Sequence, residues 1–173
     1  MRKVIIIHGW ESNPSEHWYL EEKRILEGRG YEVLVPEMPD SAHPQKDEWV
    51  KTIGNLCPDE NTILVGHSLG TPAILRYLEQ SGQKVDKVIS IAGFAQDLGY
   101  AETSNFVEEP FDWDKIKILA NKFVIIAQKE DPYVSVEIAK EVADKTNGEW
   151  VLVDGDNHFD KMDLDLMNGR LNK

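Results

Sequence analysis

The middle of the chain reads Thr62-Ile63-Leu64-Val65-Gly66-His67-Ser68-Leu69-Gly70-Thr71-Pro72. Residues 62–65 are rich in apolar and β-branched side chains, which predicts a buried strand, and Pro72 is tolerated in the first turn of a helix. Between them lies the pattern Gly-x-Ser-x-Gly, which is typical of a sharp strand-to-helix turn that exposes a serine hydroxyl. Glycines flank such a turn because side chains there would clash. The stretch therefore predicts an α/β fold with Ser68 as a candidate nucleophile at one edge of a sheet.

The rest of the chain alternates short apolar runs with longer amphipathic segments. We expect strands at residues 3–7, 31–35, 62–65, 87–91, 122–127 and 149–153. We expect helices at residues 15–27, 46–56, 71–80, 135–145 and 164–171. This alternation implies right-handed crossovers and a mostly parallel sheet covered by helices on both faces. Residues 97–113 follow neither pattern, and we interpret them as a plain surface connection, with a short flap over the site as the alternative.

Length and composition narrow the class of protein. The length of 173 residues suits one domain spanning residues 1–173. The net charge of −12 argues against binding to nucleic acid or to anionic membranes, since both need a positive patch. The single cysteine, Cys57, excludes an internal disulfide, and no apolar stretch approaches the roughly 20 residues of a membrane span. We therefore expect a cytoplasmic protein.

Few residues could serve as the base for the candidate nucleophile. A serine hydroxyl is too weak a nucleophile alone and needs a base, which is itself oriented by an acid. When the serine lies at a turn of this kind, the chain order is Ser, then Asp or Glu, then His. His158 is the one histidine after Ser68, and it follows the predicted strand 149–153. We therefore predict that His158 is the base.

The acid has more candidates. Asp131 comes shortly after the predicted strand 122–127, at the expected sheet edge, and the next residue is a proline that stiffens the loop. We therefore favour Asp131. Glu130 is its main rival, and Asp154 and Asp156 lie near His158 in the sequence.

The oxyanion that forms during acyl transfer needs backbone N–H donors that already point at it. We predict one donor at the amide of Leu69, directly after the nucleophile, and the other at the amide of Trp10, in the loop after the first strand. Gly9 would let this loop turn tightly. His8 precedes the nucleophile in the chain, so we interpret it as a structural residue that is hydrogen-bonded beneath the loop.

Short motifs occur in a fixed order over nearly the whole chain: His8-Gly9-Trp10, Asn13-Pro14, His17-Trp18, Gly66-His67-Ser68-Leu69-Gly70, Asp131-Pro132-Tyr133-Val134 and His158-Phe159. In these motifs the chain resembles the small serine hydrolases of the α/β-hydrolase superfamily, a family that includes retinoblastoma-binding protein 9 and YdeN-type bacterial proteins. The resemblance implies a compact α/β-hydrolase core without a large lid. It also implies a catalytic triad of Ser68, Asp131 and His158, with Trp10 and Leu69 as oxyanion donors.

Two positions depart from that family. Asn157 stands where such proteins commonly have glycine, but asparagine also tolerates a left-handed backbone. The namesake protein-binding activity is associated with Leu-x-Cys-x-Glu, and in residues 56–60 the cysteine comes one position too early. We therefore carry over no protein partner from the resemblance.

Two functions remain open at this point. The main hypothesis is an enzyme, a serine hydrolase that cleaves small carboxylic esters or amides through an acyl-serine intermediate. The alternative is a non-catalytic binding or regulatory protein that keeps the fold, although an intact Ser, Asp and His set favours the enzyme. Candidates to line a substrate pocket, each of them more often found in a core, are Trp10, Trp18, Phe94 and Tyr133. No two histidines have metal-ligand spacing and no glycine-rich phosphate loop is present, so we expect no metal and no cofactor.

Overall fold

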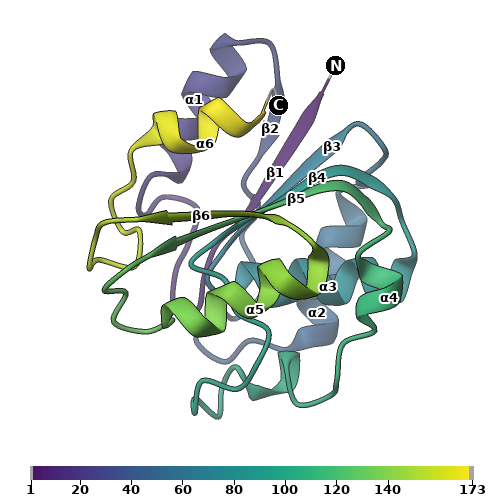
Figure 1. Cartoon of the computed structure of the whole chain (residues 1–173). Coiled ribbons are helices and arrows are strands. Elements are labelled where there is room, and N and C mark those ends of the chain that lie inside the picture. Colours follow the sequence, from purple (N-terminus) through teal and green to yellow (C-terminus); the bar gives the residue numbers. More distant parts are fainter. Residues whose placement is uncertain (1, 172–173) are drawn as a thin grey trace.

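One six-stranded sheet runs through the middle of the computed structural model, which describes residues 2–171 (Figure 1). The strands are β1 (Lys3–Ile7), β2 (Glu32–Leu34), β3 (Thr62–His67), β4 (Val85–Ile91), β5 (Ala120–Gln128) and β6 (Glu149–Val153). Their order is β2-β1-β3-β4-β5-β6, and every neighbouring pair is parallel. The predicted parallel sheet is thus confirmed, and the C-terminal ends of all its strands meet at one edge.

Helices cover both faces of the sheet. They are α1 (Tyr19–Gly28), α2 (Lys46–Asn55), α3 (Gly70–Ser81), α4 (Trp113–Ile116), α5 (Val136–Thr146) and α6 (Leu164–Leu171), with a short 3-10 helix, η1 (Ser104–Phe106). One face carries α1 and α6, and the other carries α2, α3, α4 and α5 (Figure 1). None of the helices within residues 2–171 is both long enough and apolar enough to cross a membrane.

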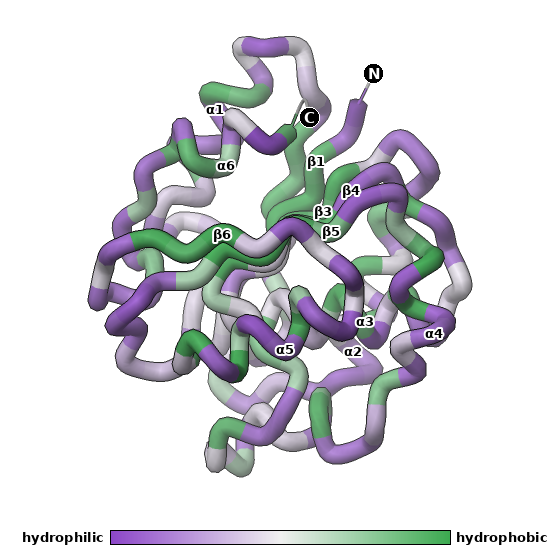
Figure 2. The backbone as a smooth tube through the Cα atoms, in the orientation of Figure 1, coloured by the Kyte–Doolittle hydropathy of each residue, from purple (hydrophilic) through white to green (hydrophobic). Residues whose placement is uncertain are grey.

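The alternation of side chains along β1 explains the two layers of core. Ile5 and Ile7 pack into the apolar cluster beneath α2 and α3, whereas Val4 and Ile6 pack into the cluster beneath α1 and α6. Figure 2 shows the hydrophobic strands gathered in the middle of the molecule. A sheet that is buried on both faces produces continuous apolar runs, which is the pattern that the sequence has.

The first helix begins later than the sequence predicts. We expected it to start at Ser15, but the Ser15 amide donates to Asn13 Oδ1 at 2.9 Å, and this local turn competes with helix formation. His17 has a left-handed backbone with φ of 52°, and α1 starts only at Tyr19. The turn therefore leaves His17 free to reach the same cavity as Ser68.

A buried carboxyl group joins α1 to α6. Glu22 is fully buried, and its Oε2 accepts a hydrogen bond from Asn168 Nδ2 at 3.4 Å, while Oε1 has no hydrogen-bond partner among residues 2–171. Arg29 donates to Asn168 Oδ1 at 2.8 Å, so this nearby cation bonds to the amide rather than to the carboxylate. Burial raises the pKa of Glu22 from 4.5 to about 7, against the smaller opposing effects of Asn168 and Arg29.

This raised pKa predicts that Glu22→Gln stabilises the protein in a pH-dependent way. A carboxyl whose pKa is higher in the folded state stabilises folding below pH 4.5, and that contribution is lost as the pH rises through about 7. One pKa unit corresponds to about 1.4 kcal/mol. Glu22→Gln should therefore increase the free energy of unfolding by about 3 kcal/mol at pH 8 and by little at pH 4.5. Urea denaturation at both pH values measures this, with exposed Glu21→Gln as the control. A Glu22→Gln variant that is no more stable than the wild type at pH 8 would show that burial does not raise the pKa of Glu22.

Candidate active site

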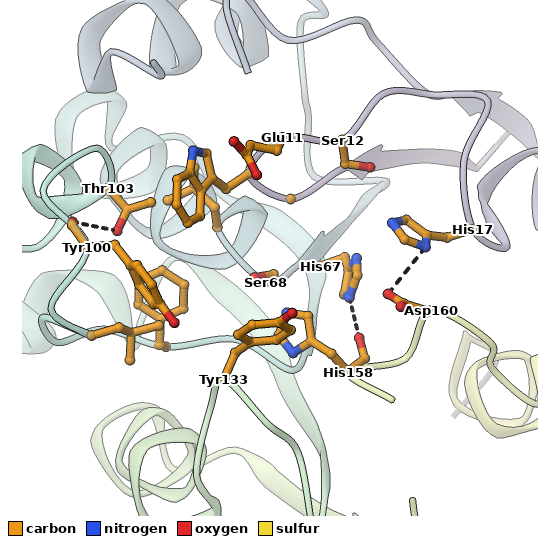
Figure 3. A pocket seen from close by; sticks show the side chains of 15 residues that line it. Glu11, Ser12, His17, His67, Ser68, Tyr100, Thr103, Tyr133, His158 and Asp160 are labelled. Carbon is orange, nitrogen blue, oxygen red and sulfur yellow. Dashed lines mark hydrogen bonds and ion pairs between the residues drawn. The ribbon is translucent and has the colours of Figure 1, made fainter. Parts of the chain in front are cut away.

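Ser68 lies on the sharp turn between β3 and α3. Its backbone is left-handed, with φ of 52°, which is strained for a residue with a side chain. The turn is held by the Ser68 amide, which donates to the Ile91 carbonyl at 2.9 Å, and by the Ser68 carbonyl, which accepts from the Thr71 amide at 3.0 Å. The hydroxyl is therefore presented at the C-terminal edge of the sheet, in the middle of a cavity (Figure 3).

Crowding explains the two glycines of the turn. A Cβ at Gly66 would lie 2.6 Å from the Thr71 amide nitrogen, and a Cβ at Gly70 would lie 2.2 Å from the Ile7 carbonyl oxygen. Both contacts are with backbone atoms, which cannot rotate away. The steric reason that we gave from the sequence is thus confirmed, and Gly70 additionally lets α3 approach β1 closely.

His158 and Asp131 meet at the same edge of the sheet. His158 Nδ1 lies 2.9 Å from Oδ1 and 2.8 Å from Oδ2 of Asp131. The Asp131 carboxylate, whose side chain is only 1% exposed, also accepts hydrogen bonds from the Tyr133 and Val134 amides at 2.9 Å each. Burial alone would raise the pKa of Asp131, but the hydrogen bonds from His158 and the two amides outweigh it, so the pKa is lowered.

This arrangement fixes the tautomer of His158. A carboxylate accepts hydrogen bonds and cannot donate one, so Nδ1 carries the proton and Nε2 keeps its lone pair. The rival acids lie elsewhere: Glu130 and Asp156 are exposed, and Asp154 pairs with Lys129 at 2.6 Å. Within the described residues, no hydrogen bond joins His158 to Ser68 Oγ, although both line the same cavity. Contacts of this kind are often loose in the absence of substrate.

The loop after β1 passes directly over Ser68. A Cβ on Gly9 would lie 3.2 Å from Ser68 Cβ and 3.7 Å from Ser68 Oγ. We expected glycine here for a tight turn, but the structure gives a different reason, because Gly9 is not among the residues with positive φ. Trp10 and Leu69 line the cavity beside Ser68, and in residues 2–171 neither amide donates to a backbone carbonyl. The prediction that these two amides donate to an oxyanion requires N–H groups without a backbone acceptor, and both meet that requirement.

The contact between Gly9 and Ser68 predicts a loss of activity in Gly9→Ala. The added methyl group would push the loop, and with it the Trp10 amide, a few tenths of an ångström away from Ser68. Because small displacements of this kind are costly at a reacting centre, the ester hydrolysis that the sequence predicts should fall roughly 10- to 100-fold in kcat/KM. Gly28→Ala is the matched control, since its Cβ meets no atom within 4 Å. Unchanged turnover by Gly9→Ala would mean that this loop does not have to lie close to the nucleophile.

The cavity around Ser68 has a volume of about 260 Å³ and two unlike sides. Tyr100 and Thr103 lie on one side of Ser68, and His17 and Asp160 lie on the other (Figure 3). Its apolar lining comes from Trp10, Leu69, Phe94, Leu98, Tyr100 and Tyr133.

Trp18, which we predicted as a candidate to line the pocket, does not line it. It is buried in the core, with its ring against Tyr19 and His67. The segment 97–113 also does more than connect, since residues 98, 100 and 103 form part of the cavity wall.

Residues 4–163 match the model of a protein family described as serine hydrolase. The chain belongs to this serine hydrolase family. YdeN of Bacillus subtilis is 32% identical to it over 163 residues, which cover 91% of this chain and 86% of YdeN. The serine hydrolase RBBP9 of Rattus norvegicus is 28% identical over 163 residues, covering 91% of this chain and 87% of RBBP9.

Solved structures agree with the family. The crystal structure of the ydeN gene product from B. subtilis matches with a TM-score of 0.92 at 29% identity, over 100% of both chains. Mouse α/β-hydrolase domain-containing protein 10 matches with a TM-score of 0.76 at 19% identity, over 98% of this chain and 88% of the mouse chain, so that likeness shows the fold alone. This serine hydrolase therefore has the α/β-hydrolase fold that the motifs imply.

His8 of this serine hydrolase is a structural residue, as its position in the chain indicated. Its ring is fully buried, Nδ1 donates to the Gly9 carbonyl at 2.9 Å, and Nε2 accepts from the Met38 amide at 3.1 Å. Burial lowers the pKa of His8, so the ring stays neutral and holds the loop over Ser68.

Two buried residues beside the site were missed by the sequence reasoning, His67 and Tyr19. His67 was treated only as a variable position of the Gly-x-Ser-x-Gly pattern, and Tyr19 as part of a helix. Tyr19 Oη lies 2.6 Å from His67 Nδ1, and His67 Nε2 lies 2.8 Å from the His158 carbonyl oxygen. The only signal in the sequence is that a histidine directly precedes the candidate nucleophile. Across residues 2–171, no cluster of three or more His, Cys, Asp or Glu side chains is suited to hold a metal ion.

Proposed function

We propose that this serine hydrolase cleaves small carboxylic esters, and small amides more slowly, through an acyl-serine intermediate. The observation that carries the proposal is the bond between His158 Nδ1–H and Asp131, which leaves Nε2 as a proton acceptor in the cavity that holds Ser68. In acyl transfer, Nε2 would take the hydroxyl proton as Ser68 Oγ attacks the substrate carbonyl.

The remaining steps use groups around the same cavity. The amides of Trp10 and Leu69 would donate to the oxyanion of the tetrahedral intermediate. His158 would then return its proton to the leaving alcohol or amine, and the acyl group would remain on Ser68. A water molecule, activated by the same Nε2, would release the carboxylic acid and restore the hydroxyl. Besides the substrate and this water molecule, the proposed steps use only side chains and backbone amides of this chain.

The small volume of the cavity favours a small substrate. Its volume of about 260 Å³ is near the low end for small-molecule sites. Aromatic rings around it, Trp10 and Tyr100 with centroids 5.2 Å apart among them, offer an apolar surface to an acyl or alkyl group. We therefore propose short acyl chains as the preferred substrates.

A panel of p-nitrophenyl esters from acetate to dodecanoate, with the matching anilides, tests this proposal. We expect measurable hydrolysis of the short esters, a decline in kcat/KM for long chains and slower hydrolysis of the anilides. The alternative, a binding protein without turnover, predicts that no ester is hydrolysed faster by this chain than by its Ser68→Ala variant.

A further inference from the structure

The ring of His67 is bonded on both sides and almost completely buried. One nitrogen, Nε2, faces the main-chain carbonyl of His158, and the other, Nδ1, faces the hydroxyl of Tyr19 (Figure 3 shows the bond to His158). His67 is the last residue of β3 and directly precedes Ser68. Its ring therefore links the backbone next to the candidate nucleophile to the backbone of the candidate base.

The positions of the protons in this chain of bonds follow from the partners. A carbonyl oxygen only accepts, so His67 Nε2 must carry a proton and donate it. The neutral ring then accepts at Nδ1, and the Tyr19 hydroxyl is the donor. Burial raises the pKa of Tyr19, so the phenol keeps its proton, and burial together with nearby His158 lowers the pKa of His67 to about 3. One tautomer of a neutral ring therefore satisfies both contacts.

The backbone that His67 holds is strained. His158 and Phe159 are consecutive residues with left-handed φ values of 53° and 57°. Such a conformation costs roughly 1 kcal/mol or more at each non-glycine residue, so it persists only where surrounding contacts enforce it. Gln128 Oε1 accepts from the Asn157 and Phe159 amides at 3.2 and 3.3 Å, which fixes the flanks of the turn. Gln128 thus bonds to the residues on either side of His158, whereas His67 Nε2 donates to the carbonyl of His158 itself.

We propose that His67 is a positioning residue of this serine hydrolase, which sets the distance between His158 Nε2 and Ser68 Oγ by holding the His158 carbonyl. Asp131 orients the ring of His158, whereas His67 fixes the main chain from which that ring extends. Tyr19 supports the arrangement by keeping the proton of His67 on Nε2. The proposal rests on the proposed function, in which His158 is the base.

The proposal can be tested with two substitutions, one that removes the N–H donor and one that keeps it. His67→Leu replaces the ring with an apolar side chain of similar size and so removes the donor. His67→Gln keeps an N–H donor near the position of Nε2. We expect kcat to fall roughly 10- to 100-fold in His67→Leu with KM unchanged, since only the geometry of the reacting groups is disturbed. His67→Gln should restore most of this loss. Thr62→Val, a buried hydrogen-bonding side chain at the other end of β3, is the matched control and should keep wild-type kcat.

Tyr19→Phe provides a second variant in case His67→Leu does not fold. It leaves His67 in place and removes the donor to Nδ1, so the ring can adopt the tautomer that no longer donates to His158. The loss of one hydrogen bond of this kind should lower kcat roughly threefold to tenfold, again without a change in KM. Wild-type kcat in a folded His67→Leu variant, or an equal loss in His67→Gln and His67→Leu, would overturn the proposal. If His67→Leu does not fold, wild-type kcat in Tyr19→Phe alone would overturn it.

A spectroscopic measurement separates this proposal from the proposed function. The proton on His158 Nδ1, hydrogen-bonded to Asp131, should give a low-field imidazole resonance in proton NMR. We expect that resonance in the wild type and in His67→Gln, and its loss through exchange in His67→Leu, because the turn that carries His158 is loosened. An unchanged resonance in His67→Leu would overturn the positioning role. If the wild type hydrolyses no ester, the proposed function fails, and this resonance still decides what His67 does.

Discussion

Ser68→Ala should abolish ester hydrolysis while leaving the fold intact. If Ser68 is the nucleophile, removing its oxygen leaves only binding and oxyanion stabilisation, so kcat should fall on the order of 10⁴-fold or more. Among residues 2–171, Ser68 Oγ has no hydrogen-bond partner, so its loss leaves no buried group unpaired. The free energy of unfolding should therefore change by about 0.5 kcal/mol or less.

Steady-state kinetics on a short p-nitrophenyl ester, together with urea denaturation, measure both effects. Ser81→Ala, at the far end of the same helix α3, is the matched control and should keep wild-type kcat. A folded Ser68→Ala variant with kcat within tenfold of the wild type would remove Ser68 from the mechanism.

Asp131→Asn should be nearly as severe, because it reverses the tautomer of His158. Oδ1 of Asp131 accepts from the Tyr133 and Val134 amides, so the amide oxygen of asparagine would keep that position. The new NH₂ group would then replace Oδ2 and donate to His158 Nδ1. This moves the ring proton to Nε2, which can no longer accept the proton of Ser68. A loss of about 10⁴-fold in kcat is the expected scale for this change.

The neighbouring acid supplies the control for that substitution. Glu130 is exposed, and its backbone amide donates to the Gly155 carbonyl at 3.0 Å, a bond that Glu130→Gln keeps. Glu130→Gln should therefore keep kcat within about twofold of the wild type, as is usual for surface substitutions. A large loss in Glu130→Gln combined with a small loss in Asp131→Asn would mean that the acid has been assigned to the wrong residue.

The sequence predicted most of what brings the candidate site together. Parallel strands end at one edge of a sheet, so residues that follow β3, β5 and β6 had to meet there. Ser68, Asp131 and His158 follow those three strands, and the structure places Asp131 on His158. Their catalytic roles remain predictions.

Other features could not be read from the sequence because they depend on packing between distant segments. The bond from His67 to the His158 carbonyl joins residues 91 positions apart, and neither residue type nor spacing signals it. The late start of α1 depends on a local turn at Asn13 that competes with a helix. The cavity wall formed by residues 98, 100 and 103 lies in a segment without periodicity, so no pattern in the sequence indicates which of its residues face the cavity.

Labelling with a fluorophosphonate, followed by peptide mass spectrometry, tests directly whether Ser68 is a base-activated nucleophile. The reagent bonds covalently to a serine only when that hydroxyl is activated by a base. We expect one adduct per chain, located on Ser68, with ester hydrolysis lost in proportion to labelling. We also expect much slower labelling of Asp131→Asn and none of Ser68→Ala. If the wild-type protein is not labelled, or if the adduct is on a residue other than Ser68, Ser68 is not the activated nucleophile.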